Sequence, residues 1–373
     1  MKAVALTRYA DIDHPESIFD TELPSPAAPA GRDMLVSVQA VSVNQLDNRV
    51  RRPKDKVEAT PRVIGFDAAG VVVAVGPDVT LFRPGDKVYY SGDPARPGSH
   101  AEFQLVDERI AGHIPSTLGF AQAAAYPMAA LTAWELLFDR MRIGDAARGK
   151  TILIIGAAGG VGSMAVQLAS RVAGLNVIAT ASRPESQEWV RRMGAHHTVD
   201  HFGDIAAQMA ALGHPAADYV AILSDTNRYY PVAAQVVAPQ GTIGLAVEAS
   251  GPVDINLLWD KSVTLVWEMI YTRIDYRTAD LARQHHILSE VARHLDAGLL
   301  MDTVTTELAP INAANLRIAH KMMATGRVIG KIVLSGFDAP ARACCSSARK
   351  QAEVAPVADM MPHELCGIAT PQL

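Results

Sequence analysis

A glycine-rich turn between an apolar run and an alanine-rich segment constrains this chain more than any other feature. Residues 151–155 are typical of a fully buried parallel strand, and residues 161–169 of a helix with small side chains toward the sheet. The glycines between them permit a sharp turn and leave no Cβ to keep a diphosphate from the helix N-terminus. Strand, turn and helix follow in the order that a dinucleotide site requires, whereas a tight turn that binds nothing is the alternative. The predicted cofactor-binding residues of this turn are Gly156, Ala158, Gly159, Gly160, Val161 and Gly162.

The pattern on either side of this turn divides the chain into three regions. Residues 1–125 carry short β-branched runs separated by Gly, Pro and Asp, which predict a small, distorted β-barrel. From residue 151 strands and helices alternate, as in a doubly wound parallel sheet. We therefore predict an α/β protein with a barrel at 1–125, a Rossmann domain at 126–302, a return to the barrel at 303–337 and a disordered tail at 338–373. Within these regions we expect a helix at 278–297, a helix at 313–324 and a strand at 331–334.

Composition argues against several kinds of protein. The net charge of −5 gives no reason to expect a nucleic acid or an anionic membrane as partner. The first eight residues are interrupted by charge too early for a signal peptide, and the long uncharged stretches contain Gly or Pro, so we expect a cytoplasmic protein. All three cysteines lie at position 344 or later, which leaves the first 343 residues without a disulfide or a thiolate metal site.

The residues after the second predicted strand of the Rossmann domain favour one nicotinamide cofactor over the other. NAD-specific sites place a carboxylate about 20 residues beyond the glycines. Here Ser182 and Arg183 stand at that point, and a guanidinium suits a 2′-phosphate, so we predict NADPH. His201 is a candidate second donor to that phosphate. The alternatives are a solvated arginine and an unrelated surface histidine.

Six stretches, at residues 41–47, 64–72, 96–103, 130–136, 156–162 and 330–333, carry a family resemblance. With them, residues 1–337 resemble the medium-chain dehydrogenase/reductase superfamily, and within it the quinone oxidoreductase branch and the group called zinc-type alcohol dehydrogenase-like proteins. The resemblance implies a chaperonin-like β-barrel as catalytic domain, NADPH in the Rossmann domain and an active site in the cleft between them. It also implies a homodimer, formed by joining the Rossmann sheets edge to edge.

The chain departs from the zinc-containing relatives at the positions of their catalytic zinc ligands. Asn44 stands where those relatives have Cys, Phe66 where they have His, and Met128 where they have Cys. None of these side chains is a good zinc ligand, so we predict no metal.

The same resemblance provides candidates for catalysis. Asn44 matches a position that lines the nicotinamide and substrate pocket, where its amide could donate to the acceptor oxygen. Thr132 matches a position beside the nicotinamide, with a hydroxyl bonded to its own helix as the alternative. Lys331 is expected by analogy near the cofactor phosphates, or else in a structural role at the start of its strand.

Other polar and aromatic residues near these positions have less definite roles. We expect Asp47 to be a structural partner of Arg49 or Arg51. Tyr89 and Tyr90 are alternative proton donors, of which only one can face the cleft, because neighbouring strand residues point to opposite faces. Phe66 and Trp267 are candidates for an apolar wall around a flat ring, or for the core.

Without a Lewis acid, hydride transfer remains feasible to a substrate that is already electrophilic. The sequence therefore predicts a zinc-independent, NADPH-dependent reductase of quinones or α,β-unsaturated carbonyls. Two alternatives stay open: a zinc-type alcohol or carbonyl dehydrogenase that recruits metal in another way, and an NADPH-binding sensor protein with negligible turnover.

Overall fold

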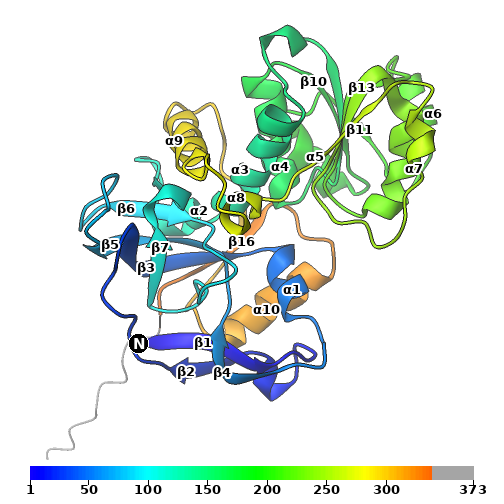
Figure 1. The fold of residues 1–373 in the computed structure, drawn as a ribbon. Helices are drawn as coiled ribbons and strands as arrows, with labels where there is room; N and C mark the ends of the chain where they lie inside the picture. Colours follow the sequence, from blue (N-terminus) through cyan, green and yellow to red (C-terminus); the bar gives the residue numbers. More distant parts are fainter. Residues whose placement is uncertain (338–373) are drawn as a thin grey trace, which may run out of the picture. The chain divides into compact units, whose positions relative to one another are not determined.

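The computed structural model describes residues 1–337, so the tail predicted at 338–373 lies outside the described residues. The chain begins in a β-rich part, continues through a parallel sheet and returns to the first part with its last helix and strands (Figure 1). Among residues 1–337, no helix is long and apolar enough to cross a membrane.

The parallel sheet has the strand order β11-β10-β9-β12-β13-β14, and all its strand pairs are parallel. Its strands are β9 (Thr151–Ile155), β10 (Asn176–Thr180), β11 (His197–Val199), β12 (Ala217–Ile222), β13 (Val237–Leu245) and β14 (Thr264–Trp267). Residues 152–155 of the central strand are fully buried, in keeping with their continuous apolar run. The order reverses beside β9, as it does in a doubly wound sheet, so the predicted Rossmann architecture is confirmed.

Helices connect the strands of this sheet and continue beyond its last strand. They are α4 (Gly160–Gln167) with its π-helical extension η5 (Leu168–Val172), α5 (Pro184–Met193), α6 (Ile205–Ala211), α7 (Thr226–Val236), η6 (Ile255–Leu258), α8 (Thr272–Asp275) and α9 (Arg283–Asp296). The helix expected at 278–297 begins only at residue 283. The Asp280 carboxylate accepts hydrogen bonds from Thr278 Oγ1 (2.6 Å) and Arg273 Nε (3.0 Å), which hold the preceding residues in a turn.

The β-rich part contains a seven-stranded sheet and a three-stranded sheet. The first has the order β15-β16-β3-β5-β6-β8 with β7 paired to β3, and the second the order β2-β1-β4. Their strands are β1 (Lys2–Arg8), β2 (Phe19–Glu22), β3 (Asp33–Val43), β4 (Val57–Val63), β5 (Asp67–Val75), β6 (Lys87–Tyr90), β7 (Phe103–Asp107), β8 (Ala111–His113), β15 (Val304–Leu308) and β16 (Lys331–Ser335). The last two strands return to this sheet from the far end of the sequence, as predicted.

Short helices surround the barrel and lead from it to the parallel sheet. They are η1 (Pro15–Ser17), α1 (Gln45–Arg51), η2 (Glu108–Ile110), α2 (Phe120–Ala124), α3 (Pro127–Trp134), the π-helical η3 (Glu135–Arg140), η4 (Asp145–Ala147) and α10 (Ala313–Ala324). In Figure 1, α1 and α10 lie side by side, and contacts between their residues agree with this view. Helix α3 packs against α4, so one of the connecting helices touches the helix that follows the glycine turn.

A direct contact joins the glycine turn to the start of β16. Gly330 N donates to Ala158 O (2.9 Å), and Gly159 forms a parallel bridge with Gly330. Lys331 follows immediately, so the predicted phosphate-binding turn and the last strand of the barrel meet at one place.

Candidate active site

The glycine turn has the geometry of an anion site. Gly156 adopts a φ of +85° and donates its N–H to Thr180 Oγ1 (3.1 Å), which closes the turn against the neighbouring strand. Helix α4 then begins, and Gly159 at its N-cap provides no side chain to bond the first N–H groups. The first N–H groups of a helix have no partner within the helix, and the helix dipole favours a negative charge beside them.

At three positions of the turn an added Cβ would meet different surroundings, so each of these glycines has a different role. A Cβ on Gly162 would lie 2.3 Å from Gly156 O, so this glycine lets the helix pack against the backbone of the turn. A Cβ on Gly160 would lie 2.6 Å from Lys331 Cδ, so this glycine lets the lysine side chain pass. A Cβ on Gly159 would come no nearer than 3.9 Å to any protein atom outside its chain neighbours, which leaves room for a ligand.

A buried carboxylate lies at the far end of that lysine. Asp67 is fully buried and accepts four hydrogen bonds, so we call it and its donors the Asp67 cluster. The donors are Ser42 Oγ (2.8 Å), Asn44 Nδ2 (2.9 Å), Met128 N (2.8 Å) and Lys331 Nζ (3.2 Å). The buried negative charge is thereby paired with a buried ammonium group and solvated by neutral donors, as a charge without water must be.

Asn44 is held from three sides within this cluster. Its amide nitrogen donates to Asp67, its amide oxygen accepts from Lys331 Nζ (2.5 Å), and its backbone N–H donates to Asp47 Oδ2 (2.7 Å). Burial raises the pKa of Asp47 to about 7, although the hydrogen bond from the Asn44 backbone acts in the opposite direction. Two predicted candidates, Asn44 and Lys331, are therefore brought into direct contact.

The structure corrects the expected partners of Asp47. Arg49 forms an ion pair with Glu248, and Arg51 Nη1 donates to Ala10 O (2.8 Å), so neither arginine is the expected partner of Asp47. Asp47 lies in the first turn of α1 and instead accepts the backbone N–H of Asn44, the residue before the helix.

The residues at the zinc-ligand positions of the zinc-containing relatives do not form a zinc site. Asn44 and Met128 converge on the Asp67 cluster, but Met128 contributes its backbone N–H. Phe66 is buried against the ring of Tyr271, with 5.4 Å between the ring centroids. Among residues 1–337, no group of three or more His, Cys, Asp or Glu side chains could hold a metal ion. An amide, a phenyl ring and a thioether do not suit Zn²⁺, so we derive no step through zinc.

Three of the four aromatic candidates lie in the core, which for Phe66 is one of the two predicted alternatives. Tyr89 and Tyr90 are both fully buried, and Tyr89 donates its hydroxyl to Leu288 O (2.6 Å). Each is enclosed by a hydrophobic core, so neither is available as a proton donor in the cleft. Phe66 belongs to the core, whereas Trp267 is half exposed at the end of the edge strand β14. Thr132 is buried on α3, one turn beyond Met128.

The residues predicted for the 2′-phosphate lie beyond the ends of β10 and β11. Arg183 Nη2 donates to Arg327 O (2.7 Å), and its Nη1 forms an ion pair with Glu185 (3.2 Å). His201 packs its ring against Phe202 and Tyr229, with 4.5 and 6.4 Å between ring centroids. Its pKa is lowered, chiefly by burial.

Two basic residues of this region escaped the sequence analysis. Arg228 stacks its guanidinium over Phe202, with 5.3 Å between Cζ and the ring centroid, and its charge also lowers the pKa of His201. A basic residue just after β12 could have been anticipated, because the carboxyl ends of parallel strands meet at one edge of the sheet. Arg327 contacts Arg183 from the segment between α10 and β16, and no spacing rule connects positions so far apart.

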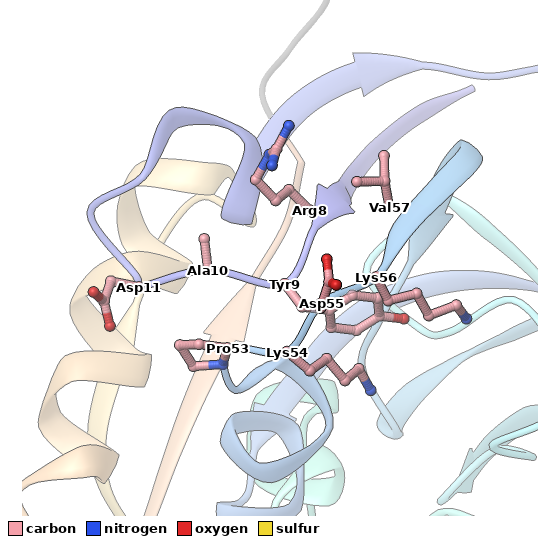
Figure 2. Close-up of a pocket in the computed structure, with 9 residues that line it drawn as sticks. All are labelled: Arg8, Tyr9, Ala10, Asp11, Pro53, Lys54, Asp55, Lys56 and Val57. Carbon is pink, nitrogen blue, oxygen red and sulfur yellow. The ribbon is translucent and has the colours of Figure 1, made fainter.

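A surface pocket lies elsewhere on the barrel. Figure 2 shows it around the ring of Tyr9, over which Lys54 Nζ lies 4.0 Å from the centroid. Its lining residues, from segments 8–11 and 53–57, include none of the predicted site residues. We assign it no part of the candidate site.

Comparisons with known proteins agree with this architecture. A family model described as an alcohol dehydrogenase GroES-like domain matches residues 30–133, and one described as a zinc-binding dehydrogenase matches residues 160–283. A zinc-type alcohol dehydrogenase-like protein of Staphylococcus aureus is 39% identical over 310 residues, which cover 82% of this chain and 92% of the relative.

Solved structures extend the same result. A putative zinc-dependent alcohol dehydrogenase from Rhizobium etli CFN 42 is 49% identical, with a TM-score of 0.87, and covers 91% of this chain and 99% of its own. A quinone oxidoreductase from Pseudomonas syringae pv. Tomato DC3000 is 26% identical, with a TM-score of 0.73, and covers 90% of this chain and 99% of its own.

A Rossmann sheet with a glycine-rich turn, joined to a GroES-like barrel, defines an oxidoreductase of a family that binds NAD(P). The chain belongs to the medium-chain dehydrogenase/reductase superfamily, and within it to the relatives named zinc-type alcohol dehydrogenase-like proteins. The resemblance drawn from the sequence is confirmed.

Proposed function

We propose that this protein is a zinc-independent reductase that uses NADPH to transfer hydride to quinones or α,β-unsaturated carbonyls. The observation that carries the proposal is the Asp67 cluster. At the place where zinc-containing relatives have metal ligands, this chain has an amide locked between a buried carboxylate and a buried ammonium group. Such a site offers hydrogen-bond donors to an oxygen but no Lewis acid.

This arrangement suits an acceptor that is already electrophilic. Bound NADPH supplies the hydride, and the protein has only to orient the acceptor and stabilise the charge that develops on its oxygen. Asn44 is the candidate donor to that oxygen, and Thr132 lies one helical turn from the Met128 N–H that binds Asp67. The proton that completes the reduction comes from solvent in this scheme, since both candidate tyrosines are buried away from the cleft.

The basic residues beyond the parallel strands support NADPH as the cofactor. Arg183 and Arg228 both lie close enough to His201 to lower its pKa. Ser182 stands where a carboxylate would bind the ribose hydroxyls of NADH. A 2′-phosphate would bring its own negative charge to this cluster of positive groups.

Replacing Arg183 by alanine should weaken NADPH binding by about 1–3 kcal/mol and change NADH binding far less, because a charge-assisted contact with the 2′-phosphate is lost. Fluorescence titration with both cofactors measures the difference. Arg191→Ala, in the exposed last turn of the same helix, is the matched control and should change neither affinity. An equal loss for both cofactors would show that Arg183 does not recognise the 2′-phosphate.

We also propose that the protein is a homodimer joined at β14. Within residues 1–337 this strand pairs only with β13 and is an edge of the parallel sheet. Large apolar side chains are exposed on it and near it, with Trp259 81%, Trp267 47% and Met269 49% accessible. An unpaired edge next to exposed aromatic residues favours pairing with a second copy.

The test of the proposed activity is NADPH oxidation by chelator-treated protein with 1,4-naphthoquinone as acceptor, corrected for the reaction without enzyme. We expect turnover that persists without metal and is faster with NADPH than with NADH. The quinone oxidoreductase among the similar structures supports this choice of acceptor. Activity that depends on added zinc would favour an alcohol or carbonyl dehydrogenase, and tight NADPH binding without turnover of quinones or enones would favour a sensor protein.

A further inference from the structure

Lys331 links the cofactor-binding turn to the candidate catalytic amide. Its backbone follows Gly330, which bonds to the turn, and its Cδ lies 2.6 Å from where a Cβ on Gly160 would be. The side chain is 3% exposed and ends between Asn44 and Asp67. The ammonium group is thus directed at the amide of Asn44 and not at the N-terminus of α4.

The bonds around Asn44 permit one orientation of its amide. An asparagine side chain has one carbonyl oxygen and two N–H donors. The oxygen accepts from Lys331 Nζ, and one N–H donates to Asp67 Oδ2. A flipped amide would direct N–H groups at the ammonium and the oxygen at the carboxylate, which is unfavourable for both charges. One N–H of Asn44 therefore remains for another acceptor.

We propose that Lys331 is a positioning residue that, together with Asp67, holds the Asn44 amide so that its second N–H can donate to the oxygen of the acceptor. The ammonium also polarises the amide carbonyl, which makes the N–H groups better donors. This inference rests on the proposed function, because it assumes that an acceptor oxygen reaches Asn44. It gives Lys331 a role other than binding the cofactor phosphates.

The proposal also explains the glycine at position 160. The lysine reaches Asn44 only by passing over the backbone of the turn, and a methyl group there would meet Lys331 Cδ. Gly160→Ala should consequently impair the same step as loss of the lysine charge, although residue 160 does not touch Asn44.

A double-mutant cycle between Lys331→Met and Asn44→Ala tests the inference. Asn44→Ala should lower kcat on the order of 100-fold, as loss of one preorganised donor does, and Lys331→Met on the order of 10-fold or more. The double variant should be no slower than Asn44→Ala alone, because both changes remove the same donor. The Kd for NADPH should change less than threefold throughout. Lys331→Arg, which keeps the charge, should recover part of the kcat lost in Lys331→Met.

The control is Lys321→Met, which removes an exposed lysine of α10 and should leave kcat unchanged. The cycle is repeated by titrating the four proteins with 1,4-naphthoquinone in the presence of NADP⁺, which reports acceptor binding without turnover. If Lys331→Met does not fold, Lys331→Gln takes its place in both cycles.

The outcomes separate this inference from the proposed function. Turnover by the wild type with multiplicative losses in the cycle, or a large rise in the NADPH Kd of Lys331→Met, would overturn the positioning role alone. Quinone binding with a non-additive cycle but no turnover would support the positioning role and overturn the proposed activity. If the wild type binds no quinone, both fail.

Discussion

Asp67→Asn should destabilise the folded protein by about 3–5 kcal/mol, because it leaves the buried ammonium of Lys331 without its counter-charge. Asp67 is fully buried and Lys331 is 3% exposed, so water cannot replace the lost partner. Three of the four donors bond to Oδ2, so an amide that keeps its oxygen there directs its N–H groups at the fourth donor, Met128 N–H. Few single substitutions cost so much.

Denaturant unfolding of both proteins measures this loss, and a second substitution identifies its cause. Lys331→Met in the Asp67→Asn background should recover much of the stability, since no buried charge then remains unpaired. Asp33→Asn is the matched control: Asp33 forms a bidentate pair with Arg96 (2.8 and 2.9 Å) but is partly exposed, so its loss should cost at most about 1 kcal/mol. If Lys331→Met fails to recover stability, the pair is not the reason for the loss.

The fold was predictable because local and global signals agree. The apolar run at 152–155, the glycines after it and the strand-helix alternation each predicted the same parallel sheet, and the structure has its strand order. The ends of helices were less predictable where side-chain hydrogen bonds determine them. Asp280 precedes α9 and binds Arg273, seven positions earlier, and this side-chain hydrogen bond has no signature in sequence periodicity.

The candidate site was predictable residue by residue but not as an arrangement. The resemblance pointed to Asn44 and Lys331 separately, whereas they are 287 positions apart in the sequence and only the fold brings them together. Asp67, the centre of the cluster, was part of a matching motif yet received no role. Its importance comes from complete burial and four converging donors, which depend on packing among α3, β3, β5 and β16.

Gly162→Ala and Gly159→Ala should both weaken NADPH binding, but only Gly162→Ala should lower stability, although the two glycines lie three residues apart in the same turn. A Cβ at 162 would lie 2.3 Å from Gly156 O and 2.5 Å from the carbonyl carbon and oxygen of Ala157. Those are backbone atoms that cannot rotate away, so the turn and α4 must move apart. We expect a loss of about 1–3 kcal/mol in stability and at least about 100-fold weaker NADPH binding.

Gly159→Ala has no such conflict in the protein itself, since the nearest atom is 3.9 Å away and the φ of −74° suits any residue. Its stability should stay within about 0.5 kcal/mol of the wild type, while NADPH binding weakens because the methyl group occupies space that a diphosphate needs. Gly144→Ala, outside the turn and with open space around it, should change neither property. Thermal unfolding and NADPH titration on all three variants separate the two effects. Unchanged NADPH binding in Gly159→Ala would contradict the assignment of the diphosphate to this turn, because the cofactor would then not approach the backbone at the N-terminus of α4.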